Sequence, residues 1–595
     1  MVQQRDQAGG VPMSILLVPE TGVGAGTGHV RRCVGLHKRF APAAAVYLPA
    51  GAREELVRAI TDELGTAAIE RSEDAFSRYN VIVYDRPVVQ QRELAPMLDS
   101  ALVIGLDIGG SGREFVNYAI DIIPRLRDNE QTNLRDLGFL ELPRAVRPTA
   151  VTQYVRALVS FGGEDPGNLT PRMVRALLSS GGFERQNITV VRGPLAQWQI
   201  PDDLRVLDRP SNLKDVLKEY DIVFTSFGLT AFEAAAAGAA VVLLNPTRYH
   251  ARLGRKVGFP EVGVGSPRRL RLRRVLQDPL LARRSAQVLN GSRATDLART
   301  LQQLSAVEQW GCPVCGRRGS RAVLRDAQRT FYRCRGCGTV YRDAFCDSGI
   351  RYNEQYFFEE YRKQYGRTYL EDYQSIRKVG LRRARRMLKL LRPRVTRRDS
   401  QGHPRLLDVG CAYGPFMDAA RRTGFRVMGV DVASAAVGYV RNTLRFPAIQ
   451  GSIEDAALRG RWKPASLDGV AMWYVIEHLD EVRTVLRWVA EVVRPGGVLA
   501  FATPNGRGIS ALKDRRAFLR NSPADHVTVW TPLVTRRVLR RFGFRTVRTV
   551  VTGHHPERFP GCARVRRGSL LYRVLLEISR MLRLGDTFEV YARRV

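Results

Sequence analysis

Short apolar runs alternate with amphipathic stretches through the first 300 residues of the chain. Each run has the length and composition of a strand that is buried on both faces of a parallel sheet. The pattern predicts two doubly wound α/β lobes, over 13–148 and 149–303, that flank a cleft. The predicted strands lie at 14–18, 44–48, 81–85 and 101–105 in the first lobe, and at 157–163, 188–191, 221–225 and 240–244 in the second.

The same alternation returns over residues 403–595, which predicts a third α/β domain. The segment before it, 350–398, is rich in tyrosine and arginine and is predicted to be a helical lid or linker. Within it, Tyr361, Tyr365 and Tyr369 follow i, i+4 spacing and would share one helix face, as core packing or as part of a lid. The predicted fold class is multidomain α/β, because a single core stops growing at about 250–300 residues.

The formal net charge of +36 is the property that a nucleic-acid binder would show. However, the sequence has no helix-turn-helix or ribonucleoprotein motif. In the basic segment 382–398, leucines, Ala384 and Met387 recur at helical spacing, which predicts a helix with a solvated basic face. We therefore interpret the charge as arginines spread over many surfaces. No DNA partner is expected, RNA is the weaker alternative, and any membrane contact would be peripheral.

Four of the eight cysteines form the pattern C-x2-C-x18-C-x2-C. Two closely spaced pairs direct four thiolates at one tetrahedral ion, and the intervening length suits a β-hairpin. A catalytic zinc keeps an open position that four cysteines would fill, so residues 308–346 are predicted to be a ribbon with structural zinc. Nucleic-acid binding by this ribbon is the alternative. The predicted ligands are Cys312, Cys315, Cys334 and Cys337.

Cellular location follows from what the sequence does not contain. Eight cysteines are too few for a disulfide scaffold in a chain of this length. No apolar run reaches the ~20 residues that span a bilayer, and the run 14–18 is too short for the core of a signal peptide. These features predict a cytoplasmic protein.

A glycine-rich turn follows the first predicted strand. Its spacing excludes a phosphate-binding P-loop, because Gly28 is followed by His29 rather than Lys, and it lacks the third glycine of a dinucleotide fingerprint. The segment Gly26-Thr27-Gly28-His29-Val30-Arg31-Arg32 resembles the motif of the UDP-sugar hydrolase of pseudaminic acid synthesis. That family has the two-lobed GT-B glycosyltransferase fold. The segments 160–166 and 225–233 are similar to its second-lobe motifs.

This resemblance implies roles for residues in both lobes. Glu233 would accept hydrogen bonds from the ribose of uridine, and the helix N-terminus at Gly228 and Thr230 would face the diphosphate. Gly28 would allow close approach of the substrate, and His29 would act as the base. Alternatively, Thr230 and Glu233 form a capping box and His29 is structural. The sequence suggests no role for Asp85 or Asp107, and leaves hydrolysis, glycosyl transfer and binding alone open.

A second glycine turn follows the predicted strand 405–409. It is similar to the glycine loop of class I methyltransferases, with Asp408 ending the strand. Asp431, at the end of the next strand, would then bind the ribose hydroxyls of S-adenosylmethionine. The segment 451–455 falls where the third strand of that family meets adenine. The implied cofactor-binding residues are Asp408, Gly410, Ala412, Gly414, Asp431, Ser452 and Ile453.

The ribbon and the tyrosine-rich segment also resemble those of zinc-ribbon methyltransferases, some of which methylate deoxysugar nucleotides. His478 and His526 are the candidate bases, and each is equally consistent with a role in orienting a loop. The sequence thus predicts a bifunctional enzyme of surface-sugar synthesis that binds a nucleotide sugar or other sugar-containing substrate. An RNA methyltransferase and a methyltransferase with a non-catalytic glycan-binding unit are the alternatives.

Overall fold

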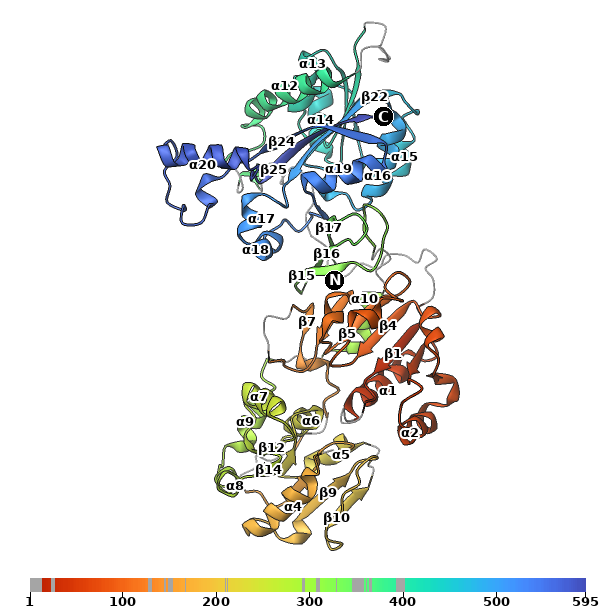
Figure 1. The fold of residues 1–595 in the computed structure, drawn as a ribbon, viewed down its shortest axis with the longest axis vertical. Coiled ribbons are helices and arrows are strands. Elements are labelled where there is room, and N and C mark those ends of the chain that lie inside the picture. Colours follow the sequence, from red (N-terminus) through yellow and green to blue (C-terminus); the bar gives the residue numbers. More distant parts are fainter. Residues whose placement is uncertain are drawn as a thin grey trace. The chain divides into compact units, whose positions relative to one another are not determined.

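A computed structural model shows how these segments fold (Figure 1). It divides into two compact units, one up to Trp310 and one from Gly311 onward, with Arg325–Ala327 assigned to the first. Each unit is described by itself. The structure describes residues 13–22, 27–126, 131–143, 146–147, 153–165, 167–208, 210, 212–291, 295–305, 311–327, 329–344, 358–359, 361–362, 366–391 and 402–595.

The first unit begins with a parallel sheet in the order β3-β2-β1-β4-β5-β6-β7. Four of its strands, β1, β2, β4 and β5, reproduce the predicted apolar runs, and their residues are buried, whereas β3, β6 and β7 were not predicted. The strands are β1 (Ile15–Pro19), β2 (Ala44–Tyr47), β3 (Ile69–Glu70), β4 (Val81–Asp85), β5 (Leu102–Leu106), β6 (Tyr118–Asp121) and β7 (Leu134–Arg135). The helices are α1 (Gly28–Phe40), α2 (Glu54–Leu64) and α3 (Gln91–Leu94).

A second sheet of the same unit has the order β10-β9-β8-β11-β12-β13-β14 and is parallel except at β13–β14. Its strands β8, β9, β11 and β12 follow the predicted runs, whereas β10, β13 and β14 were not predicted. Its strands are β8 (Ala157–Val159), β9 (Ile188–Arg192), β10 (Arg205–Asp208), β11 (Ile222–Thr225), β12 (Ala240–Asn245), β13 (Glu261–Val264) and β14 (Ser266–Pro267). Its helices are α4 (Leu169–Ser180), α5 (Leu213–Val216), α6 (Leu229–Ala236), α7 (Arg248–Val257), α8 (Arg269–Leu276), α9 (Leu281–Gln287) and α10 (Leu297–Ser305).

Both sheets reverse their strand order next to their first strand. In the first sheet β1 pairs with β2 on one side and β4 on the other, and in the second β8 pairs with β9 and β11. In such sheets the crevice for a ligand opens beyond the carboxyl ends of the strands at this point. The two glycine turns of this unit follow β1 and β8, so each lies at such a crevice.

The second unit opens with the cysteine ribbon, whose strands are β15 (Arg321–Arg325), β16 (Arg329–Arg333) and β17 (Val340–Ala344). A fourth strand, β23 (Thr528–Val529), completes this sheet and pairs with β17 through Val340 and Val529. The sequence predicted a separate ribbon over 308–346. Instead, Cys312 and Cys337 share a buried cluster with Trp488 of the following domain, so the ribbon is packed into that domain.

The remainder of the second unit is a sheet in the order β20-β19-β18-β21-β22-β25-β24, in which β25 runs antiparallel to both neighbours. Its strands are β18 (Arg405–Val409), β19 (Arg426–Asp431), β20 (Ala448–Gln450), β21 (Leu467–Trp473), β22 (Val493–Pro504), β24 (Phe544–Thr552) and β25 (Thr587–Arg594). Its helices are α12 (Tyr373–Leu390), α13 (Pro415–Arg422), α14 (Ser434–Asn442), α15 (Ala456–Arg459), α16 (Val482–Val492), α17 (Ile509–Lys513), α18 (Arg515–Arg520), α19 (Pro532–Arg541) and α20 (Leu570–Met581).

Helix α12 confirms the predicted basic helix as far as Leu390, and 392–398 lie outside the described residues. Its basic face is not wholly solvated, as the sequence predicted. Arg383 is buried, and its Nε donates to Glu589 Oε1 at 2.8 Å, while Arg386 donates to the other oxygen of that carboxylate. These arginines turn inward because β25 places the buried carboxylate of Glu589 under this helix, and their positive charges neutralise it.

The predicted tyrosine face is only partly observed. Tyr369 lies in a turn before α12, so it does not share a helix face with Tyr361, and Tyr365 lies outside the described residues. The rings of Tyr361 and Tyr369 are nevertheless in edge contact at 5.1 Å, and Tyr369 lies 6.1 Å from Tyr413. These two tyrosines pack over the second glycine loop, and whether the segment acts as a lid stays a prediction.

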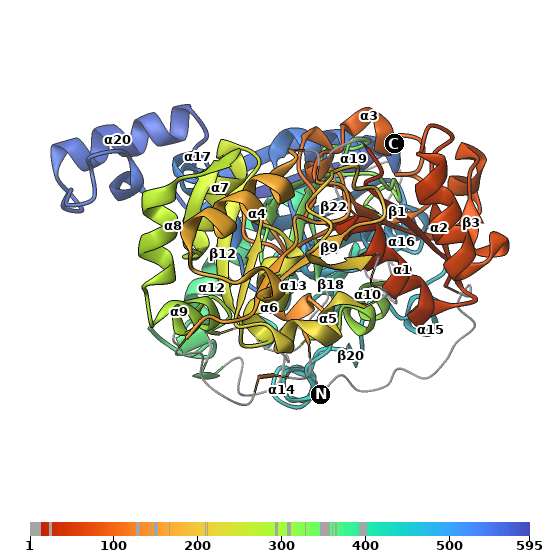
Figure 2. The same cartoon turned by 90° about the horizontal axis from the view of Figure 1, so that it is seen from below.

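Helix α20 stands apart from the sheet of the second unit in both views (Figures 1 and 2). It is inserted between β24 and β25.

Among the residues that the structure describes, no helix combines the length and the apolar character that crossing a membrane requires.

Candidate active sites

The glycine loop after β18 has a backbone that only some residues tolerate. Gly410, Ala412 and Gly414 have φ values of +72°, +46° and +79°, in the left-handed region. At Gly410 a side chain is also excluded by space, because a Cβ there would lie 2.4 Å from Val475 Cγ2. The loop is therefore tightly closed, and glycine at 410 is required both by its backbone conformation and by the lack of space.

Asp431 is fixed beside this loop at the end of β19. Its Oδ2 accepts the backbone N–H of Ala412 at 2.8 Å, and its Oδ1 accepts that of Ala433 at 2.9 Å. Burial raises the pKa of this carboxyl group, and these hydrogen bonds oppose the rise. Each oxygen keeps a lone pair for a further donor. Binding of the two ribose hydroxyl groups of a cofactor by this carboxylate stays a prediction.

The other predicted cofactor residues lie in the same region with different degrees of burial. Asp408 is almost fully buried under the loop, and burial together with the charge of Asp431 raises its pKa well above the ordinary range. Ser452 accepts the backbone N–H of Glu454, and Ile453 is buried in the core below β20. Contact between these three residues and a cofactor stays a prediction.

The structure brings the two candidate bases together. His478 follows β21 and His526 precedes β23, and their rings meet edge to face with centroids 4.7 Å apart. His478 Nδ1 lies 3.0 Å from Asp525 Oδ2. The sequence singled out both histidines but not the orienting carboxylate of Asp525, although that residue directly precedes His526.

The two histidines have opposite electrostatic environments. Burial disfavours protonation of His478, but Asp525 and the neighbouring Glu477 outweigh this and raise its pKa. Burial and the charge of His478 lower the pKa of His526 to about 3. Burial also raises the pKa of Glu477 to about 7. His526 is therefore neutral at physiological pH and a weak base, whereas the environment of His478 makes it the stronger base of the pair.

The four cysteines converge as their spacing predicts. The Sγ atoms of Cys312 and Cys337 lie 3.6 Å apart, and those of Cys315 and Cys334 lie 3.5 Å apart. Zinc–sulfur bonds of about 2.3 Å in a tetrahedron place sulfurs about 3.8 Å apart. Gly338 has a φ of +81°, and its N–H donates to the carbonyl of Cys334, which closes the second turn. The cluster is confirmed and fits zinc, and the metal itself stays a prediction.

In the first unit His29 is the first member of a buried charge network. Its Nδ1 lies 2.6 Å from Asp85 Oδ1, and Arg32 donates to both oxygens of Asp85 and to Asp107. Burial disfavours the charged imidazole, yet Asp85 raises the pKa of His29, and Arg32 helps lower that of Asp85 to about 2. The sequence suggested no role for Asp85 or Asp107. In the structure these two carboxylates orient His29 and Arg32 and balance their charge.

The three motifs of this unit lie close together. A Cβ built at Gly163, in the turn after β8, would lie 2.5 Å from the side chain of Thr27. A Cβ built at Gly28 would lie 3.1 Å from Leu229, the first residue of α6. Gly24 and Gly26 lie outside the described residues. Thr27 and Gly28, directly before His29, thus meet both second-lobe motifs.

The capping-box alternative for Glu233 is wrong. Helix α6 begins at Leu229 with Gly228 as its N-cap, and no side chain caps it. Thr230 is already inside the helix, so it cannot be the capping residue. Burial raises the pKa of Glu233, opposed by Lys214, whose Nζ lies 3.9 Å away, and by Arg31. Ribose binding by Glu233 stays a prediction.

Two features define a class I methyltransferase domain. One is the strand order of the last sheet, in which the antiparallel strand β25 lies between β22 and β24. The other is the glycine loop with Asp431 beside it. Consistently, residues 373–549 match the family model described as a methyltransferase domain. The second unit of this protein therefore contains a class I S-adenosylmethionine-dependent methyltransferase domain.

Individual relatives each match a limited share of the chain. A ubiquinone biosynthesis O-methyltransferase of Paracidovorax citrulli is 32% identical over 108 residues, which are 17% of this chain and 44% of that protein. One of Idiomarina loihiensis is 29% identical over 135 residues, or 22% of this chain and 53% of that protein. The chain thus spans about half the length of such relatives or less.

Among solved structures, a SAM-dependent methyltransferase from Archaeoglobus fulgidus aligns at 19% identity and a TM-score of 0.29. The alignment covers 40% of this chain and 98% of the other. A TM-score this low supports no functional conclusion.

Replacing Asp431 by alanine should weaken S-adenosylmethionine binding by about 2–3 kcal/mol, the scale of two charge-assisted hydrogen bonds. Titration calorimetry on the full chain measures this directly. Glu577→Ala is the matched control, because Glu577 is an exposed acid of α20 that pairs only with Arg580. Equal affinity in the Asp431 variant and the wild type would remove Asp431 from the cofactor site.

Proposed function

We propose that the second unit transfers the methyl group of S-adenosylmethionine to a hydroxyl group of a sugar-containing acceptor. The observation that carries this proposal is the His478–His526 pair at the carboxyl end of the sheet that also holds Asp431. The O-methyltransferase names of the relatives support an oxygen acceptor. The ribbon would be structural and would hold zinc through its four cysteines.

The residues present suggest how the transfer proceeds. S-adenosylmethionine, when bound, supplies an electrophilic methyl group on a sulfonium sulfur. An unprotonated imidazole of the His478–His526 pair accepts the proton of the acceptor hydroxyl as the oxygen lone pair forms the new bond to the methyl carbon. The carbon–sulfur bond breaks and its electrons leave with S-adenosylhomocysteine. His478, held by Asp525, positions His526 through their ring contact.

For the first unit we propose hydrolysis or glycosyl transfer of a UDP-sugar in a GT-B-like pair of lobes. The contact between His29 and Asp85 supports a base whose orientation is fixed, as in other base–carboxylate pairs. The convergence of the His29 turn with Gly163 and Leu229 supports a site formed by both lobes. With both activities the chain would be a bifunctional enzyme of surface-sugar synthesis.

Incubation with radiolabelled S-adenosylmethionine and a panel of nucleotide sugars, with RNA in parallel, tests the proposed acceptor. Label should enter a nucleotide sugar, and His526→Ala should lower the rate by about 10²–10⁴-fold, the contribution typical of a general base. His555→Ala is the control, because His555 pairs with Glu557 in the segment between β24 and β25. Label in RNA and in none of the sugars would contradict the proposal and favour the RNA alternative.

A further inference from the structure

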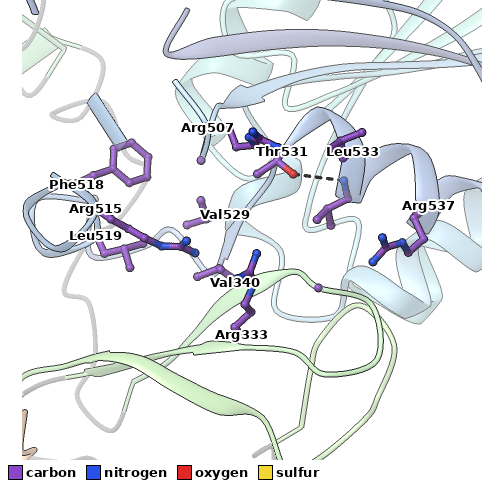
Figure 3. Close-up of a pocket in the computed structure, with 13 residues that line it drawn as sticks. Arg333, Val340, Arg507, Arg515, Phe518, Leu519, Val529, Thr531, Leu533 and Arg537 are labelled. Atoms are coloured by element: carbon purple, nitrogen blue, oxygen red, sulfur yellow. Dashed lines mark hydrogen bonds between the residues drawn. The ribbon is translucent and has the colours of Figure 1, made fainter. Parts of the chain in front are cut away.

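A cavity of about 190 Å³ lies in the second unit, where the ribbon meets the methyltransferase domain. Four arginines from four different segments line it (Figure 3). Arg333 ends β16, Arg507 follows β22, Arg515 begins α18 and Arg537 lies in α19. None of the described residues that line this cavity is acidic.

Among the described residues, no carboxylate pairs with these arginines. The guanidinium groups of Arg333, Arg507 and Arg515 make no hydrogen bond or ion pair with the described part of the chain, and Arg537 makes one long bond, 3.5 Å, to the carbonyl of Cys337. By contrast, Arg383 of α12 binds Glu589. Four cationic groups around one space without a counter-charge repel one another, so an anion would be stabilised there.

The neighbouring acid does not relieve this repulsion. Asp514 directly precedes Arg515, but its Oδ1 accepts the backbone N–H of Ala517 and caps α18. Burial and the charge of Arg333 both lower the pKa of Arg515, which is the response expected of an uncompensated cation. Figure 3 shows Arg333 and Arg515 extending toward the same space from two different elements.

The lining indicates which anion fits. Guanidinium groups bind phosphate oxygens in a two-pronged geometry, and the remaining wall includes Phe518, Leu519 and Leu533, which favour an organic ligand over a free ion. Recognition of RNA would need a basic surface that follows many phosphates, whereas this cavity has room for one phosphate or diphosphate group. The chemistry therefore favours a small phosphorylated molecule.

The cavity also lies at a useful distance from the candidate base. Val529 lines the cavity, and His526 is three residues earlier in the chain. Three residues span at most about 11 Å between Cα atoms. Arg507 follows the carboxyl end of β22, the edge of the sheet at which His478 lies. The lining of the cavity thus comes within about 11 Å of the backbone of His526.

We propose that this cavity binds the phosphate or diphosphate group of the methyl acceptor, so that the acceptor is a sugar phosphate or a sugar linked to a nucleoside diphosphate. The inference rests on the proposed methyl transfer and names its substrate class. The arginines act in binding and orientation, and they take no part in the proton transfer.

Calorimetric titration of the full-length protein with inorganic pyrophosphate tests the cavity. The double variant Arg333→Gln/Arg515→Gln should weaken this binding by at least about 10-fold or remove one binding event, because charged hydrogen bonds are each worth about 1.5–3 kcal/mol. Arg516→Gln/Arg536→Gln is the control, since it removes the same charge from α18 and α19 outside the cavity. The control should bind pyrophosphate like the wild type.

Equal weakening in both double variants would show a general effect of net charge and would overturn the proposal, as would an absence of saturable pyrophosphate binding. A nucleoside diphosphate, titrated in the same variants, shows whether the cavity prefers an esterified phosphate to the free ion. S-adenosylmethionine affinity is measured in parallel and should not change. If the wild type binds pyrophosphate through the cavity but does not bind S-adenosylmethionine, the methyl-transfer proposal fails and the anion site stands.

Discussion

Cys334→Ser should yield a protein that no longer retains zinc and whose ribbon does not fold. Four thiolates fill the coordination of the ion, and binding of structural zinc in small domains is worth about 10–16 kcal/mol near neutral pH. Elemental analysis should find one zinc per wild-type chain and none in the variant, and thermal unfolding should begin at a lower temperature.

The position of the ribbon sharpens this prediction. The cofactor loop follows β18 and Asp431 ends β19, and neither strand belongs to the sheet of the ribbon, so S-adenosylmethionine affinity should survive. Methyl transfer should be lost, because β17 pairs with β23 and β23 follows His526 directly. Cys562→Ser is the control, since Cys562 lies outside the cluster. Wild-type protein that contains no zinc when purified without chelators would contradict the assignment.

His29→Ala should lower turnover of a UDP-sugar by about 10²–10⁴-fold while UDP still binds. The imidazole of His29 can act as a base only when it is neutral. The rate should therefore rise as the pH increases through the pKa of His29, which Asp85 holds above its ordinary value. Asp85→Asn removes that effect and should move the acid limb of the pH–rate profile to lower pH. His37→Ala, at a buried histidine of the same helix, is the control.

Glu233→Ala should show the reverse behaviour in the same assays. UDP binding should weaken by about 1–3 kcal/mol, the scale of hydrogen bonds to a charged group, since Glu233 is predicted to bind ribose. A variant that unfolds at a lower temperature but binds UDP normally would make Glu233 structural. Wild-type protein that neither binds UDP nor cleaves any UDP-sugar would contradict the whole assignment of the first unit.

Features that depend on local pattern could be predicted from the sequence, and those that depend on long-range pairing could not. The apolar run 81–85 is β4 residue for residue, and the cysteine spacing gave the observed cluster. The partner of His29, Asp85, lies 56 residues away and meets it only because β4 pairs with β1. The position of Asp85 at the end of a predicted strand was the signal in the sequence that could have indicated a role in the site.

Two other differences have similar causes. Tyr369 has helical spacing from Tyr361 but lies in a turn, where packing on Tyr413 outweighs local periodicity. The ribbon was predicted as a separate module, because nothing in 308–346 shows that a two-residue strand nearly 190 residues later completes its sheet.

The pairing of β17 with β23 determines which fragments of this protein can be expressed alone. A fragment with the bounds of the family match, 373–549, would lack the ribbon and leave the edge of β23 unpaired, exposing Val529 and an open strand to self-association. It would also lack β25, which lies between β22 and β24, so β24 would lose its only neighbour in the described sheet. A soluble, monodisperse methyltransferase fragment therefore has to include 311–595.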